Sequence, residues 1–409
     1  MDYGTEPGKL KKIKRSSMFS SLLLLLLLVP LAAATNTNLF GTVNVQSQVY
    51  VASINTIDGT KTNLGQGALL EGQAQGLSCG LGNEIFIIGF NFTTSTANLL
   101  GFNIHDGSIQ HDVTLPFAES GFVGVGQQLA CDVSDLIVVG HDKVNGSLIH
   151  HVLSFNPTTK EMTSIVKISG SHIGILGSTS TMDTKRGVFY TSFATNKSGT
   201  IDINMYAIST RKGNTDYGQY IIVPTNPSIG HSFGPMKYDV TLDSIIGFSR
   251  NPTTKARNIL QMEATSLQQQ QQQEQQETKR TWKAIGDVVG YEMEDGNIIA
   301  INGKQNILYA ILQPTPTGPQ TYVNESNCAP SCATNTFCCR DPTQPDDDGS
   351  CYTVPCGRIP TGSSGVNMTE PFRLVAFNLK ENAKVIGVPP SLCTLAANDC
   401  PWQMDVMNE

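Results

Sequence analysis

Residues 129–158 read LACDVSDLIVVGHDKVNGSLIHHVLSFNPT, and this stretch contains the unit from which the chain is built. An expected inner strand, Leu129–Val133, runs into the polar turn Ser134-Asp135, and an aliphatic strand, Leu136–Gly140, follows it. A further strand, Leu148–Phe155, ends in an Asn-Pro-Thr turn. Short runs rich in Ile, Val, Leu and Phe between turn residues are typical of β-strands rather than helices.

The same unit recurs along the chain. The turn that ends its third strand falls at Asp58, Asp106, Pro157 and Arg211, which gives spacings of 48, 51 and 54 residues. A period near 50 residues with about four short strands per unit is typical of β-propeller blades. Tandem β-sandwiches are the alternative, but their repeats are usually closer to about 100 residues. We therefore predict an all-β chain that folds as a β-propeller of five or six four-stranded blades over residues 35–409.

The number of blades depends on the two ends of the chain. Five units are nearly complete, whereas residues 48–64 supply only the two outer strands of another unit. A six-bladed ring requires the short stretch after Pro390 to return and supply the missing inner strands.

Residues 1–34 have the pattern of an export signal. A basic stretch, Lys9–Arg15, precedes an apolar run, Met18–Leu31, and three alanines end at Ala34. The apolar run falls short of the roughly 20 residues that span a bilayer. We expect cleavage after Ala34 and secretion to the extracellular space; the alternative is a single-pass, signal-anchored membrane protein.

The charge of the remaining chain excludes one class of partner. Residues 35–409 carry 22 basic and 32 acidic side chains. Binding to nucleic acid depends on phosphate neutralisation by Lys and Arg. We expect an extracellular protein or glycan as partner and no nucleic acid, with a membrane involved only if the signal segment is uncleaved.

Two insertions interrupt the repeat. Residues 263–281 contain a poly-Gln tract with little apolar surface to bury, so we expect a disordered, low-complexity loop there. Residues 313–371 are rich in Pro and Gly and contain six of the ten cysteines, namely Cys328, Cys332, Cys338, Cys339, Cys351 and Cys356. Their spacing lacks the paired C-x2-C pattern usual for zinc, and an exported chain favours disulfides. We expect a small disulfide knot whose connectivity the sequence leaves open.

The other four cysteines suggest a link between blades. Cys79 and Cys131 occupy matching places just before consecutive aliphatic strands, so a disulfide between neighbouring blades fits if their Cα atoms lie within about 7 Å. Cys393 and Cys400 would then pair with each other. A different pairing of these four cysteines remains open.

Five N-glycosylation sequons begin at Asn91, Asn145, Asn196, Asn324 and Asn367. Each falls between the second and third strands of its unit, and in a propeller these connections open on one face. Glycans would crowd that face, so a large partner would reach the opposite face or the disulfide knot more easily.

The sequence shows no catalytic motif, so we favour a binding or scaffold protein of unknown ligand over an enzyme. One regularity favours the alternative, a secreted propeller hydrolase or lyase with a calcium ion in its channel. Asp132, Asp183 and Asp239 recur near the ends of the inner strands, and carboxylate oxygens are ligands that Ca²⁺ prefers. The simpler interpretation is that these aspartates cap the turns that follow, so apart from this calcium no cofactor is expected.

Overall fold

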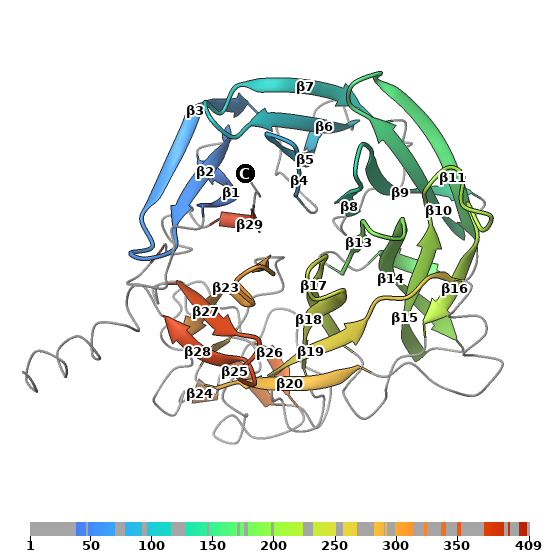
Figure 1. The fold of residues 1–409 in the computed structure, drawn as a ribbon. Coiled ribbons are helices and arrows are strands. Elements are labelled where there is room, and N and C mark those ends of the chain that lie inside the picture. Colours follow the sequence, from blue (N-terminus) through green and yellow to red (C-terminus); the bar gives the residue numbers. More distant parts are fainter. Residues whose placement is uncertain are drawn as a thin grey trace, which may run out of the picture. The chain divides into compact units, whose positions relative to one another are not determined.

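In the computed structural model the described residues are 38–45, 48–69, 78–91, 96–115, 128–144, 147–169, 172–175, 179–197, 200–223, 232–250, 257–267, 282–289, 291–292, 299–314, 323–324, 337–340, 350–352, 372–387, 392 and 401–406. They all belong to one unit, Asn38–Glu409. Its regular structure consists of antiparallel β-sheets, six of which surround a common centre (Figure 1). The chain is therefore a six-bladed β-propeller, which confirms the predicted fold class and excludes tandem sandwiches.

Blades 1 to 3 each have four strands, which we name A to D from the centre outward. Blade 1 consists of β29 (Pro401–Val406), β1 (Asn38–Val45), β2 (Gln48–Asn55) and β3 (Lys61–Leu69). Blade 2 consists of β4 (Cys79–Leu81), β5 (Glu84–Asn91), β6 (Thr96–Asn103) and β7 (Ile109–Thr114). Blade 3 consists of β8 (Gln128–Cys131), β9 (Leu136–Val144), β10 (Ser147–Asn156) and β11 (Glu161–Ser169).

Blades 4 and 6 divide strand A into two pieces. Blade 4 has β12 (His172–Ile175) and β13 (Thr181–Asp183), both paired with β14 (Val188–Lys197), followed by β15 (Thr200–Ser209) and β16 (Tyr220–Val223). Blade 5 consists of β17 (Ser232–Asp239), β18 (Ser244–Arg250), β19 (Arg257–Glu263) and β20 (Lys283–Val288). Blade 6 has β21 (Tyr291–Glu292) and β22 (Ile299–Asn302), both paired with β23 (Ile307–Pro314), followed by β27 (Arg373–Asn378) and β28 (Lys384–Gly387).

The aliphatic runs are buried on both faces because each blade packs between two others. In β5, Ile85 and Ile87 contact the core shared with blade 1, while Phe86 and Ile88 contact the core shared with blade 3. All four are at most 1% exposed. Successive side chains of a strand point to opposite faces, so an unbroken apolar run fits a strand with two packed faces. Such runs revealed the second strands in the sequence.

The two ends of the described chain close the ring in blade 1. β1 pairs with β2 on one side and with β29 on the other, with Leu39 opposite Val406 (Figure 1). The C-terminal stretch thus supplies one of the two inner strands that six blades required, and β1 supplies the other. The expectation that residues 48–64 supply the only strands at the N-terminal end was wrong, because Asn38–Val45 is a strand. Its sequence, NLFGTVNV, contains two asparagines and a glycine and was too polar to be recognised as one.

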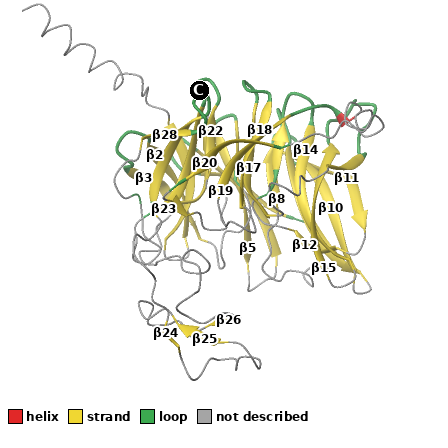
Figure 2. Cartoon of the chain, turned by 90° about the horizontal axis from the view of Figure 1, so that it is seen from below, coloured by secondary structure: helices red, strands yellow, loops and turns green. Residues whose placement is uncertain are grey.

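The A–B and C–D turns lie together at one end of the strands, which Figure 2 shows as loops at the top of the sheets. In the C–D turn of blade 2, the Asn103 Oδ1 accepts the His105 N–H and the Asp106 Oδ1 accepts the Ser108 N–H, both at 2.8–2.9 Å. Gly107 has a φ of 69°, and a Cβ there would lie 2.3 Å from the carbonyl oxygen of Leu64. This turn needs glycine because it packs directly against blade 1.

Both predicted insertions fall in connections between neighbouring strands of a blade. The poly-Gln tract lies between β19 and β20 and outside the described residues. β23 and β27 pair directly with each other, so residues 315–371 form an excursion between two neighbouring strands. Of that excursion the structure describes β24 (Val323–Asn324), β25 (Phe337–Arg340) and β26 (Ser350–Tyr352), which are hydrogen-bonded to one another as a separate sheet.

Candidate functional site

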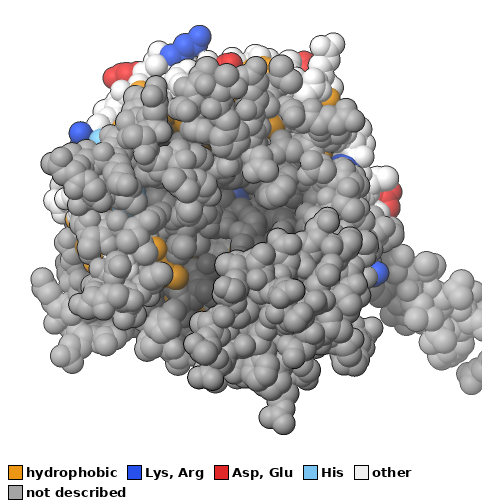
Figure 3. Space-filling model, turned by 180° about the vertical axis from the view of Figure 1, so that it is seen from behind, with side chains coloured by type: hydrophobic (Ala, Val, Ile, Leu, Met, Phe, Trp, Pro, Cys, Tyr) orange, Lys and Arg blue, Asp and Glu red, His pale blue; other side chains and the backbone are white. Residues whose placement is uncertain are grey.

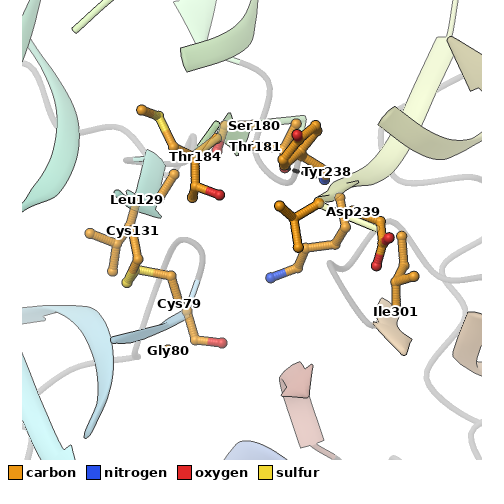
Figure 4. Close-up of a pocket in the computed structure, with 15 residues that line it drawn as sticks. Cys79, Gly80, Leu129, Cys131, Ser180, Thr181, Thr184, Tyr238, Asp239 and Ile301 are labelled. Atoms are coloured by element: carbon orange, nitrogen blue, oxygen red, sulfur yellow. Dashed lines mark hydrogen bonds between the residues drawn. A yellow bond between two sulfur atoms is a disulfide. The ribbon is translucent and has the colours of Figure 1, made fainter. Parts of the chain in front are cut away.

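A cavity of about 200 Å³ lies at the centre of the propeller. Its walls come from strand A of five blades, and Thr184 and Val240 place it where these strands run into the A–B turns. Figure 4 shows the labelled side chains of this site, which we call the channel pocket, arranged around a central space. The lining residues are Ser78, Cys79, Gly80, Leu129, Ala130, Cys131, Ser180, Thr181, Met182, Thr184, Lys237, Tyr238, Asp239, Val240 and Ile301.

Two serine hydroxyls of the channel pocket are unused. Ser78 is 2% exposed and Ser180 is 3% exposed, and neither Oγ has a hydrogen-bond partner within the part of the chain that the structure describes. A buried hydroxyl without a partner costs about 1–3 kcal/mol, and most buried polar groups in proteins avoid that cost. The nearby Thr181 differs, because its Oγ1 accepts the N–H of Tyr238 at 2.7 Å.

The predicted link between blades forms one wall of the pocket. Cys79 of blade 2 and Cys131 of blade 3 are joined by a disulfide, with their Cα atoms 5.5 Å apart. This pairing agrees with the expectation from their matching sequence positions. The other eight cysteines lie outside the described residues or in strands whose side chains are not described, so their pairing stays a prediction.

The predicted metal candidates have structural partners. The Asp183 Oδ1 accepts the N–H groups of Lys185 and Arg186, and the Asp239 Oδ1 accepts those of Thr241 and Leu242, all at 2.7–3.0 Å. Each carboxylate therefore caps its A–B turn, as the simpler interpretation of these residues held.

Register distinguishes the third aspartate from the other two. Asp183 and Asp239 are the last paired residues of their strands, whereas Asp132 lies one residue beyond Cys131, which holds that place in blade 3. In blade 6 the same place belongs to Asn302, whose Oδ1 accepts the Gln305 N–H at 3.1 Å. The sequence interpretation grouped Asp132 with the other two and missed Asn302, because it compared residue types rather than registers.

Asp132 instead accepts a hydrogen bond from the next blade. The Arg211 Nη2 lies 2.7 Å from the Asp132 Oδ1 and also donates to the carbonyl oxygen of Thr184 at 2.7 Å. Its Nη1 donates to the carbonyl oxygen of Lys185 at 3.1 Å. Arg211 thus fixes the A–B turns of blades 3 and 4 beside the pocket.

A second ionic cluster joins blades 4 and 5, and we call it the clasp. Arg186 Nη1 lies 2.9 Å from the Asp183 Oδ2 and 2.6 Å from the Asp243 Oδ1, while its Nη2 lies 2.7 Å from the Asp243 Oδ2. Lys185 adds a bond to the Asp243 Oδ2 at 2.8 Å, and the Tyr238 hydroxyl donates to the Asp243 Oδ1 at 3.0 Å. The bidentate contact with Arg186 holds the pKa of Asp243 well below its usual range. Burial, together with the nearby carboxylates, raises the pKa of Tyr238.

Calcium in the channel stays a prediction. Among the described residues no group of three His, Cys, Asp or Glu side chains could hold a metal ion. Asp183 and Asp132 are paired with arginines, and Asp239 lines the pocket but caps the N–H groups of Thr241 and Leu242. The three aspartates therefore do not form a shared ligand set.

Of the five sequons, Asn91 and Asn196 lie in described blade strands, at the end of the strands opposite the channel pocket. Asn91 ends β5 and Asn196 lies near the end of β14, both leading into B–C connections. Asn145 lies between β9 and β10, and Asn324 and Asn367 lie between β23 and β27. Figure 3 views this reverse face, where acidic and basic side chains of described residues lie mainly around the periphery. Modification of the asparagines stays a prediction.

Among the described residues, no helix is long and apolar enough to cross a membrane. The signal segment lies outside the described residues.

Fold and site together define a six-bladed propeller with a small polar pocket in its channel. No protein-family model matches the chain, and no curated protein matches its sequence. Among solved structures, it is similar to the periplasmic gluconolactonase of Pseudomonas aeruginosa, with a TM-score of 0.44, 9% identity, and coverage of 90% of this chain and 99% of that chain. The β-propeller domain of the Trilobed protease from Pyrococcus furiosus gives a TM-score of 0.37 at 9% identity, covering 84% and 92%. An oligogalacturonate lyase in complex with manganese gives 0.42 at 9% identity, covering 86% and 85%. Similarity this low carries no information on the activity of this chain.

Proposed function

We propose that this chain is an exported, N-glycosylated binding protein of the extracellular space, whose binding face consists of the A–B and C–D turns. The placement of the sequons carries this proposal, because all five lie at or within B–C connections while the channel pocket lies at the A–B turns. Glycans on the first face would leave the second free for a partner. The partner class is an extracellular protein or glycan.

The binding face is also held in shape. Asp183 and Asp239 each cap their own A–B turn. The clasp and Arg211 connect neighbouring A–B turns by hydrogen bonds of 2.6–2.7 Å. Val133 and Val240, which follow strand A in blades 3 and 5, are 71% and 57% exposed. Exposed apolar groups on a fixed polar surface are features common in recognition sites, because little entropy is lost on binding.

Glycan shielding tests the choice of face. Asp58→Asn and Asp106→Asn each complete an acceptor sequon in a C–D turn, because Gly59-Thr60 and Gly107-Ser108 follow. Both aspartates are exposed, and their Oδ1 atoms accept the N–H groups two residues on, which an asparagine oxygen can also accept. We expect the double variant, with both glycans attached, to lose at least about tenfold in capture of extracellular partners compared with the unmodified protein.

The control is to trim the glycans of both the double variant and the unmodified protein with an endoglycosidase that leaves one N-acetylglucosamine on each asparagine. This keeps the two substitutions in place, and the two trimmed proteins should capture partners equally. Equal capture by the glycosylated double variant and the unmodified protein would show that binding uses another face. Peptides from residues 1–34 in the mature protein, or unmodified asparagine at all five native sequons, would contradict export and glycosylation.

A further inference from the structure

The channel pocket has features that contact with a large partner does not explain. It is small, at about 200 Å³, and Ser78 and Ser180 lie in its wall with buried hydroxyls that have no partner among the described residues. Two such groups from different blades beside one cavity indicate a ligand that supplies the missing hydrogen bonds.

We propose that the channel pocket binds a small uncharged polyhydroxylated molecule, such as a monosaccharide or a cyclic polyol. This inference deepens the proposed function, because the pocket belongs to the proposed binding face, but it names a ligand that requires no macromolecular partner.

The hydrogen-bonding groups of the pocket favour a hydroxylated ligand. A serine hydroxyl both donates and accepts, and a ligand hydroxyl does the same, so each pair satisfies both partners. Thr181 adds a third hydroxyl whose oxygen already accepts the Tyr238 N–H and whose hydrogen is available to donate. These groups come from blades 2 and 4 and approach the cavity from two directions.

The charges of the pocket favour a neutral ligand. Lys237 and Asp239 lie two residues apart on β17 and both line the cavity, so one positive and one negative residue belong to the same wall. Together the two residues carry no net charge, so the pocket offers no overall attraction to a ligand of either sign. A zwitterion would pair with both residues, and alanine is included in the test for that reason. An uncharged ligand can accept a hydrogen bond from Lys237 and donate one to Asp239.

The volume of the channel pocket and its apolar lining residues also fit a small polyhydroxylated ligand. Pockets for drug-sized ligands have volumes of roughly 300–1,000 Å³, so this cavity takes a smaller molecule. Leu129, Ile301 and Met182 provide apolar surface next to the hydroxyls. The ring of a sugar or cyclic polyol has carbon-bound hydrogens on its faces and hydroxyls at its edge, which matches a pocket of this mixed character.

The test is titration of the purified full chain with D-glucose, D-galactose, D-mannose and myo-inositol, using isothermal calorimetry and the midpoint of thermal unfolding. Glucuronate, glucosamine and alanine serve as acidic, basic and zwitterionic comparators. We expect saturable binding of at least one neutral compound and at least tenfold weaker binding of the charged comparators. No saturable binding, or preference for a charged compound, would overturn the proposal.

Two serine variants separate binding from folding. Ser78→Ala and Ser180→Ala each remove one of these hydroxyls, so we expect about tenfold weaker binding of the neutral ligand while the unfolding midpoint stays the same or rises. Ser249→Ala is the matched control, because Ser249 is also buried and its Oγ also lacks a partner among the described residues, but it lies outside the pocket. Ser249→Ala should bind as the unmodified protein does.

Sugars also stabilise proteins by exclusion from their surface. A rise in the unfolding midpoint that persists in the Ser78→Ala, Ser180→Ala double variant would be this general effect and would count against the pocket. The two proposals fail in different experiments. Capture of a macromolecular partner by the glycan-shielding variants tests the proposed function, and calorimetric binding of the small ligand tests the pocket.

Discussion

Replacing Arg186 with alanine should destabilise the propeller far more than replacing its neighbour Lys185, although both side chains bind Asp243. Arg186 makes three charge-assisted hydrogen bonds at 2.6–2.9 Å, to Asp243 and to Asp183. The arginine side chain is 21% exposed and that of Asp183 is 0% exposed. Lys185 makes one such bond and is 54% exposed.

The expected magnitudes follow from burial. Removing one partner of a buried ion pair costs about 3–5 kcal/mol, and a hydrogen bond to a charged group contributes about 1.5–3 kcal/mol. Asp183 keeps two backbone N–H donors after the loss of Arg186, which lowers the cost, so we expect about 3 kcal/mol for Arg186→Ala. Exposed pairs contribute about 0–1 kcal/mol, so Lys185→Ala should cost less than about 1 kcal/mol.

Chemical denaturation followed by tryptophan fluorescence, to which Trp282 contributes, measures both values. Trp282 is 3% exposed and lies in the core shared by blades 4 and 5, the two blades that the clasp joins. The free energy of unfolding is compared for the unmodified protein, Arg186→Ala and Lys185→Ala under identical conditions. Equal losses in the two variants, or a loss below about 1 kcal/mol for Arg186→Ala, would refute the assignment of the clasp as a buried ionic contact between blades.

The pH dependence of the free energy of unfolding gives an independent check on the contact between Arg186 and Asp243. Arg186 holds the pKa of Asp243 below its usual range, so the carboxylate favours the folded state at pH values above its unfolded pKa of about 4. This contribution is lost as the pH falls through the lower folded pKa. The stability difference between the unmodified protein and Arg186→Ala should therefore be constant near neutral pH and shrink below about pH 4.

Two further predictions concern cross-links. The Cys79–Cys131 disulfide closes a separation of 52 residues, so the Cys79→Ala, Cys131→Ala double variant should lose about 4 kcal/mol of unfolding free energy, measured by denaturation; an unchanged value would contradict a structural role. Deleting residues 318–366 and joining the flanks with a Gly/Ser linker should leave a secreted, cooperatively unfolding protein, because β23 and β27 remain paired as a hairpin. Intracellular retention of the deletion variant alone would show that the cysteine-rich insertion is part of the fold.

Local pattern was enough to predict the blades. The aliphatic second strands are buried on both faces, and their turns repeat at a nearly constant spacing, so the signal is contained in short windows. β1 was missed because it pairs with β29 from the other end of the described chain and packs against distant blades, so no short window of sequence contains its partners. A strand that contains asparagine and glycine has weak propensity of its own and is stabilised by these partners.

The site was less predictable for the same reason. Cys79 and Cys131 could be paired because they hold equivalent positions in consecutive units. The contact between Arg211 and Asp132 spans 79 residues and depends on a one-residue offset in register, which no sequence spacing reveals. Ser78 and Ser180 belong to no sequence motif. They stand out only in the structure, because their buried hydroxyls have no hydrogen-bond partner among the described residues.

The pairing of β1 with β29 has a consequence for biosynthesis. During translation β1 emerges early and β29 emerges last among the described strands, so the inner edge of β1 stays unpaired until Pro401–Val406 has been made. An unpaired strand edge is a template for pairing with other chains. Until β29 arrives, the inner edge of β1 is therefore open to pairing with other chains. A chain that ends before Pro401 lacks β29 and leaves blade 1 without its inner strand.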